Sequence, residues 1–289
     1  MKEEKTRGTM LTSTALILCC VTFGAGFLCG DLVAEYRSAG SPHAQVAAPA
    51  QPAPAKTAQP APAKATVSEA DEAARAAAHI AELRARAEKD PGNADLWTHL
   101  GNVCYDSGDR DGAIDAYRRS LAIAPGNADV MTDMGSMYRM KGQSVEAVKI
   151  YEQAIALKPG HTNAIFNKGV TLMLDMARPA AAMDFWKGEL AKHPDITLGS
   201  GAKLGAVLHE IALDAAMQLE SHGLYDAALA AYAEAQKAKP DFVPALIYNA
   251  WLLENMKRQS EALPLWKRVL ELQPDAFDPA GKPVRDHIR

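Results

Sequence analysis

Residues 94–127, ADLWTHLGNVCYDSGDRDGAIDAYRRSLAIAPGN, and residues 128–161, ADVMTDMGSMYRMKGQSVEAVKIYEQAIALKPGH, follow one pattern over 34 residues each. A glycine comes seven residues after the start of both stretches, and an alanine, a tyrosine and a proline follow it at equal distances. A period of 34 residues indicates a helix-turn-helix unit that recurs along the chain. The small residues let two antiparallel helices pack closely, and the proline ends the second helix.

Prolines mark further units of the same kind. They recur at separations of 34, 34, 35, 46 and 34 residues, at Pro91, Pro125, Pro159, Pro194, Pro240 and Pro274. Alignment on these prolines predicts a repeat domain over 94–274 with units at 94–127, 128–161, 162–195, 209–242 and 243–276. The small residues predicted on the second helices are Ala113, Ala147, Ala181, Ala228 and Ala262. The aromatic residues predicted to fill the space between neighbouring units are Tyr117, Tyr151, Phe185, Tyr232 and Trp266.

The overall composition supports a helical fold. Hydrophobic residues make up 48% of the chain but aromatic residues only 6%, and alanine is the largest contributor to the apolar class. Alanine favours helices, whereas strands favour β-branched and aromatic residues, so the composition argues against an all-β fold. The formal net charge of −4 gives no basic footprint for nucleic acid, and no nucleic-acid partner is expected.

The repeated pattern resembles the tetratricopeptide repeat family. That resemblance implies an all-α superhelical solenoid of about five helix-turn-helix repeats, whose concave groove is lined by the first helices and usually binds a protein or a peptide. The matching positions are polar in the first two units and apolar in the last three. These predicted groove residues are Thr98, Asn102, Tyr105, Thr132, Ser136, Arg139, Phe166, Val170, Met173, Leu213, Met217, Ile247 and Trp251.

Segments on both sides of the repeats and within them are also predicted. Residues 68–90, opened by Ser68 and stopped by Pro91, read as one helix that caps the first repeat. The 12 extra residues before the fourth unit, around 195–206, read as a flexible link. The tail over 277–289 is short and rich in turn residues, so the last repeat is expected to expose an apolar flank unless the tail or a partner covers it.

The N-terminal part predicts a membrane anchor. Residues 10–30 contain 21 consecutive uncharged residues, enough to cross a bilayer and longer than the apolar part of a cleaved signal peptide. Three basic residues precede this span, so residues 1–9 are expected in the cytoplasm and the repeats in the periplasm of a bacterium, anchored in its inner membrane. Residues 31–67 are rich in alanine and proline and predict a disordered, semi-rigid linker.

The sequence offers no motif for catalysis. Cys104 is alone outside the span, and the histidines form no metal-binding spacing: His209 and Glu210 begin an H-E-x-x-H pattern, but Leu213 stands in place of the second histidine. The glycines at 199–205 lack the spacing of a phosphate-binding loop. We therefore expect no enzyme activity, no cofactor and no metal.

The sequence leaves three functions open. The first is a membrane-tethered scaffold or adaptor that binds a protein or peptide partner in the groove. The second is an apocytochrome c chaperone, because the helix entering the first repeat, IAELRARAEKDPGNADLWTHLG, is similar to the tetratricopeptide subunits of cytochrome c maturation. The third is a structural scaffold that assembles with copies of itself. A further alternative is that the 195–206 link, the tail or tight winding of the superhelix covers the apolar row.

Overall fold

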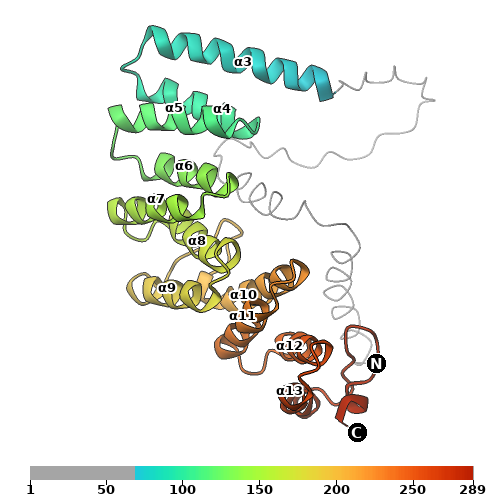
Figure 1. Ribbon diagram of the computed structural model, residues 1–289. Coiled ribbons are helices and arrows are strands. Elements are labelled where there is room, and N and C mark those ends of the chain that lie inside the picture. Colours follow the sequence, from blue (N-terminus) through green and yellow to red (C-terminus); the bar gives the residue numbers. More distant parts are fainter. Residues whose placement is uncertain (1–68, 289) are drawn as a thin grey trace, which may run out of the picture. The chain divides into compact units, whose positions relative to one another are not determined.

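The computed structural model describes residues 69–288, and within them the fold is all-α (Figure 1). The predicted segments at 1–9, 10–30 and 31–67, and Ser68, lie outside the described residues. None of the helices in 69–288 has both the length and the apolar character needed to cross a membrane. The all-helical repeat fold that the sequence predicts is confirmed.

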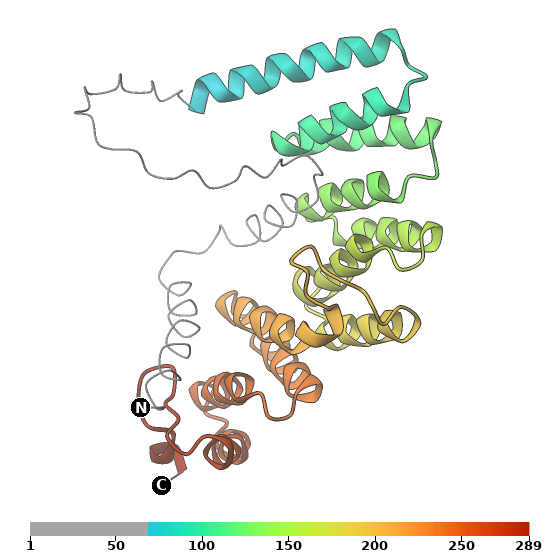
Figure 2. The same cartoon turned by 180° about the vertical axis from the view of Figure 1, so that it is seen from behind.

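Eleven α-helices make up the described part of the chain, and each packs against its neighbours in chain order (Figures 1 and 2). A single helix, α3 (Glu69–Lys89), precedes the repeats. The first helices of the five units are α4 (Ala94–Asp106), α6 (Ala128–Met140), α8 (Thr162–Val170), α10 (Leu204–Ser221) and α12 (Val243–Asn255). The second helices are α5 (Arg110–Ile123), α7 (Ser144–Leu157), α9 (Pro179–Lys192), α11 (Tyr225–Ala238) and α13 (Gln259–Leu272).

Local sequence determines where the helices begin and end. The side chains of Asn93 and Asn127 accept hydrogen bonds from backbone N–H groups in the first turns of α4 and α6, which satisfies donors that the helix leaves unpaired. The turn inside each of the first two units contains a glycine, Gly108 or Gly142, with a positive φ angle. That backbone conformation is easily reached only by glycine, so these residues let the chain reverse direction within a few residues.

The small residues on the first helices leave room for the large aromatic residues on the second. A Cβ atom added at Gly135 would lie 2.6 Å from Cε1 of Tyr151, and one added at Gly101 would overlap the ring of Tyr117. Both tyrosine side chains are fully buried. The glycines are therefore required by the close approach of the two helices in each unit.

In the third unit, the buried residues of the second helix are shifted by one position from the predicted register. Ala182 and Trp186 are fully buried, whereas Ala181 and Phe185, which the alignment had placed in the core, are only half-buried. The reason is η1 (Thr171–Asp175), a π-helical turn that follows α8 and takes up one extra residue. This extra residue explains why Pro159 and Pro194 are 35 residues apart instead of 34.

The insertion before the fourth unit is a short hairpin followed by an early helix start. Thr197 and Lys203 form an antiparallel bridge, and the Leu204 N–H donates to the Ile196 carbonyl at 2.9 Å. The fourth unit was predicted to begin at 209, but α10 already begins at Leu204. The extra residues therefore divide between the hairpin and a lengthened first helix of 18 residues.

The C-terminal tail repeats the same hairpin and covers the last unit. Phe277 and Pro283 form the matching antiparallel bridge, and the Val284 N–H donates to the Ala276 carbonyl at 3.0 Å. The 3₁₀-helix η2 (Val284–Ile288) follows and packs against α13, with Val284 fully buried. Of the two expectations for the apolar flank of the last repeat, the structure thus shows coverage by the tail.

The opposite end of the repeats is covered by α3. Leu83 and Ala87 are buried against α4 and belong to the same apolar cluster as Trp97 and Leu100. Cys104 is buried in this cluster, and its burial raises the pKa of the thiol to about 11. The thiol is therefore protonated and unreactive at neutral pH, as expected for a core cysteine.

Candidate functional site

The candidate site is the surface formed by the first helices of the five units together with η1, which we call the first-helix face. All thirteen predicted groove residues lie on α4, α6, α8, η1, α10 or α12. Eleven of them are half-buried, so part of each side chain reaches the surface. The other two, Thr132 and Met173, are buried and offer nothing to a partner.

The first unit contributes polar side chains that are already engaged inside the protein. The Thr98 and Ser120 hydroxyl oxygens lie 2.7 Å apart. The Tyr117 hydroxyl donates to Oδ1 of Asn102 at 2.9 Å, so Asn102 fastens the two helices of its unit. Tyr105 is half-buried among the apolar residues of the same cluster. These contacts fix the orientation of the polar side chains before any partner arrives.

The second unit continues the polar part of the face. The Thr132 hydroxyl donates to the Ala128 carbonyl at 2.8 Å within its own helix, and this hydrogen bond satisfies the buried hydroxyl. The Ser136 hydroxyl lies 3.2 Å from the Tyr151 hydroxyl, and burial raises the pKa of Tyr151, which keeps it protonated. Arg139 forms an ion pair with Asp175 of η1 and so joins the second unit to the third.

The third unit begins the apolar part of the face. The ring of Phe166 stacks on Trp186 with 6.2 Å between ring centroids, and Val170 packs against the same cluster. Met173 is only 1% exposed because the π-helical turn η1 directs it into the core. The apolar row thus contains Phe166 and Val170 but lacks Met173.

The fourth and fifth units extend the apolar row. Leu213 and Met217 of α10 are half-buried at the edge of one apolar cluster, together with Tyr248 of α12. Ile247 and Trp251 lie at the edge of the cluster of the last unit. The Trp251 ring contacts the ring of His287 edge-on at 6.4 Å, so the C-terminal tail covers part of this side chain.

Several residues of the face were not predicted from the sequence. Asn167 donates to the Ser136 hydroxyl at 3.4 Å, and Asp175 pairs with Arg139. Glu220 accepts from the Tyr232 hydroxyl at 2.7 Å, and Glu254 accepts from Nε1 of Trp266 at 2.9 Å. Each carboxylate lies four residues after the small residue of its first helix, Ala216 or Ala250, and this shared spacing was a signal available in the sequence.

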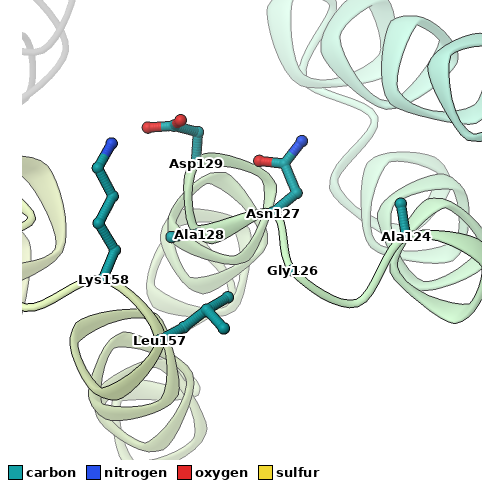
Figure 3. Close-up of a pocket in the computed structure, with 7 residues that line it drawn as sticks. All are labelled: Ala124, Gly126, Asn127, Ala128, Asp129, Leu157 and Lys158. Carbon is teal, nitrogen blue, oxygen red and sulfur yellow. The ribbon is translucent and has the colours of Figure 1, made fainter.

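A recess of about 500 Å³ lies beside the turn between the first two units (Figure 3). It is lined by Ala124, Gly126, Asn127, Ala128, Asp129, Leu157 and Lys158. Its polar groups have structural tasks, since Asn127 caps α6 and Oδ1 of Asp129 lies 2.9 Å from Nε2 of the buried His161. The lining therefore positions the turn and contains no nucleophile paired with a base.

The described residues also contain no group of three or more histidine, cysteine, aspartate or glutamate side chains placed to hold a metal ion. Burial raises the pKa of both Tyr151 and Tyr232. The Tyr232 hydroxyl donates to Glu220, and the Tyr151 hydroxyl lies 3.2 Å from that of Ser136, so both have structural contacts in the core. The half-exposed apolar and polar side chains of the first-helix face suit a binding role.

Family models agree with this description of the first two repeats. Two family models match, both described as tetratricopeptide repeat, at residues 94–127 and 130–162. Among solved structures, the MamA protein is 22% identical over 63% of this chain and 92% of its own, with a TM-score of 0.41. YrrB, described as a tetratricopeptide repeat protein with an unusual peptide-binding site, is 17% identical over 67% of this chain and 93% of its own, with a TM-score of 0.40.

A third solved structure, PilF of Pseudomonas aeruginosa, is 20% identical over 71% of this chain and 87% of its own, with a TM-score of 0.39. No curated protein matches the sequence.

Proposed function

We propose that this chain, which is a tetratricopeptide repeat protein, is a membrane-tethered, non-catalytic scaffold that binds a protein or peptide partner on its first-helix face. Proteins of this family generally act as interaction scaffolds, and the repeats of this chain support that general role. The tether, the compartment and the surface that the partner contacts are the specific parts of the proposal.

The main support for the proposed binding surface is the half-exposed apolar row on the first helices. Val170, Leu213, Met217 and Ile247 come from three successive units, and each keeps part of its side chain at the surface while the rest packs on the core. A row of this kind can bury the apolar side of a bound segment, and burial of apolar surface is the main source of binding free energy. Methionine adapts its shape to such a ligand.

The observation that supports the tether is the uncharged stretch at 10–30. It is followed by about 37 residues before the linker ends at 67, and an extended alanine- and proline-rich chain rises about 3.1 Å per residue. Such a linker holds the repeats away from a bilayer surface. Lys2, Lys5 and Arg7 precede the span, so we place the repeats in the periplasm and the anchor in a bacterial inner membrane.

Affinity capture with the full-length chain tests the binding surface. The test variant is Met217→Asp with Ile247→Asp, which introduces charge into the row at half-buried positions. The matched control is Val145→Asp with Leu263→Asp, the same chemical change at exposed positions of second helices, 56% and 37% exposed. The wild type and the control are expected to retain a partner in host membranes that the test variant loses, while circular dichroism shows equal helix content. Recovery of the same partners by all three proteins would disprove the proposed surface.

Extraction and a reporter fusion test the tether. Alkaline phosphatase fused after residue 67 is expected to be active, because the enzyme needs the oxidising periplasm, and the fusion should resist alkaline extraction. Deletion of residues 10–30 is the control and should give a soluble, inactive fusion. An inactive full-length fusion, or one released by alkali, would refute the proposed topology.

A further inference from the structure

Charge is distributed unequally between the two sets of helices. Within the described units, the first helices and η1 carry nine Asp and Glu residues but only two Lys and Arg residues. The second helices carry ten acidic and nine basic residues. The excess of negative charge in the repeats therefore lies on the helices that form the first-helix face.

Both basic residues of the first helices are already paired within the protein. Arg139 pairs with Asp175, and its side chain is only 17% exposed. Lys168 lies 2.8 Å from Oε1 of Glu152 on α7 and sits over the ring of Phe185, which places it on the side of the second helices. Neither residue neutralises the acidic groups of α10, which contains no Lys or Arg at all.

Glu210 and Asp214 of α10 form the acidic pair of interest. They are four residues apart and share the side of α10 that faces away from the buried Ala212 and Ala216. Partial desolvation of Asp214, whose side chain still reaches the surface, raises its pKa, and the charge of Glu210 raises it further. Two like charges one turn apart disfavour each other. Among the described residues, no basic side chain forms an ion pair with Asp214.

Apolar side chains lie directly beside this acidic pair. Leu213 and Met217 project from the same side of α10, and both belong to the half-exposed edge of a cluster that includes Tyr248. An occupant of this surface therefore meets two acidic residues whose backbone positions are about 6 Å apart along the helix axis, with an apolar patch next to them. A ligand that carries both positive charges and apolar side chains would complement this surface in charge and bury its apolar part.

We infer that the first-helix face at α10 binds a basic amphipathic segment of a partner protein, with Lys or Arg side chains on Glu210 and Asp214 and apolar side chains on Leu213 and Met217. This inference rests on the proposed binding function and adds the chemistry of the partner. An acidic or phosphorylated segment does not fit, because it would place further negative charge beside two carboxylates. No basic side chain among the described residues forms an ion pair with Asp214, and Oε1 of Glu210 lies 3.8 Å from Nε2 of His209.

Peptide binding to the full-length chain in nanodiscs of zwitterionic lipid tests the inference. The probe is a fluorescent helical peptide of Leu, Ala and Lys with Lys pairs four residues apart, and the comparison peptide has Glu at every Lys position. Empty nanodiscs measure the background binding to lipid. Glu210→Gln with Asp214→Asn removes the proposed charges, and Asp184→Asn with Glu271→Gln removes the same charge from second helices.

The basic peptide is expected to bind wild type at least tenfold more tightly than the acidic peptide. The α10 variant should lose about tenfold in affinity for the basic peptide at low salt, and the control pair less than twofold. Raising the salt concentration should weaken the binding of the basic peptide to wild type more than its binding to the α10 variant. Equal binding of both peptides, or equal losses in the two charge variants, would overturn the inference.

Two further measurements separate this inference from the proposed function. If both peptides bind equally and Met217→Ser weakens the binding of both, the proposed binding face is supported and the inferred preference for a basic partner is disproved. If Met217→Ser changes the affinity for neither peptide, the proposed binding face itself is disproved. Binding of the basic peptide only after removal of residues 39–66 would show that the linker is the occupant, and this outcome also overturns a partner segment.

Discussion

Nε2 of His287, in the C-terminal tail, lies 2.9 Å from Oδ2 of the buried Asp278. The other ring nitrogen lies 2.8 Å from Oε2 of Glu254 on α12, and the ring stacks on Trp266 at 4.6 Å. Oδ1 of Asp278 accepts from the backbone N–H groups of Ala280 and Lys282, which shapes the hairpin. One histidine therefore connects the tail to the last repeat.

Replacing His287 with alanine should destabilise the repeats. The substitution leaves Oδ2 of the buried Asp278 without its partner and removes the stack on Trp266, so we expect a loss of about 3 kcal/mol in the free energy of unfolding. Urea unfolding followed by tryptophan fluorescence measures it. His222→Ala, at an exposed turn, is the control and should change stability by well under 1 kcal/mol. Equal stability of the two variants would mean that the tail is not seated on α13.

Gly169→Ala should be strongly destabilising although alanine is the better helix former. The added Cβ would overlap the indole of Trp186, and overpacking of this kind costs about 1–3 kcal/mol. Gly188→Ala on α9 is the matched control, since its Cβ meets nothing within 4 Å, and it should stabilise by up to about 1 kcal/mol. Thermal unfolding of both variants gives the comparison. A change of the same sign in both would contradict the packing described for the third unit.

The register of the third unit predicts opposite sensitivities at two adjacent residues. Trp186→Ala removes a fully buried indole whose Nε1 donates to the Ile165 carbonyl at 3.1 Å, and should cost about 3–5 kcal/mol. Phe185→Ala removes a half-buried ring under Lys168 and should cost about 1 kcal/mol. Denaturant unfolding of the two variants decides the register, and a larger loss at Phe185 would restore the alignment expected from the sequence.

Most of the repeat architecture could be predicted because its cause is local and periodic. Small residues, aromatic residues and prolines recur at fixed distances, and each of them has one packing role. The single extra residue between Gly169 and Trp186 could not be placed, because a π-helical turn and a longer loop satisfy the same spacing. Only the direction of Trp186 toward Gly169 distinguishes them.

The tail and the binding face were harder to predict for a different reason. The network of Glu254, Asp278 and His287 joins residues up to 33 positions apart, and no short pattern contains it. One signal was present: Gly201 and Gly281 each lie seven residues after a unit-ending proline, and both have positive φ angles in matching hairpins. Burial of Thr132 and Met173 depends on helix rotation, which family positions alone do not determine.

Asp214 gives a pH-dependent prediction. Its pKa is raised above the ordinary value of 3.8 in the folded protein, so the folded state holds the proton more tightly than the unfolded state. Between the pKa of the unfolded state and the higher pKa of the folded state, stability falls as the pH rises. Above both pKa values the ionised carboxylate disfavours the folded state. Because solvent screens this exposed carboxylate, Asp214→Asn should raise the melting temperature at pH 7 by no more than about 1 °C and leave it unchanged near about pH 3.

Scanning calorimetry at the two pH values measures this difference. Asp184→Asn, the same change at another exposed position, on α9, should show no such pH dependence. A lower melting temperature of Asp214→Asn at pH 7 would show that Asp214 has a stabilising partner.

The two ends of the repeat array are held by different kinds of contact, and we expect this difference to decide the end from which the array opens. Each unit is stabilised mainly by its neighbours, so opening starts at an end and proceeds inward. At the N-terminal end α3 is held by the buried Leu83 and Ala87, while at the other end the hydrogen bonds of His287 fasten the tail. Amide hydrogens of α3 should therefore exchange with solvent before those of α13, and His287→Ala should abolish that order.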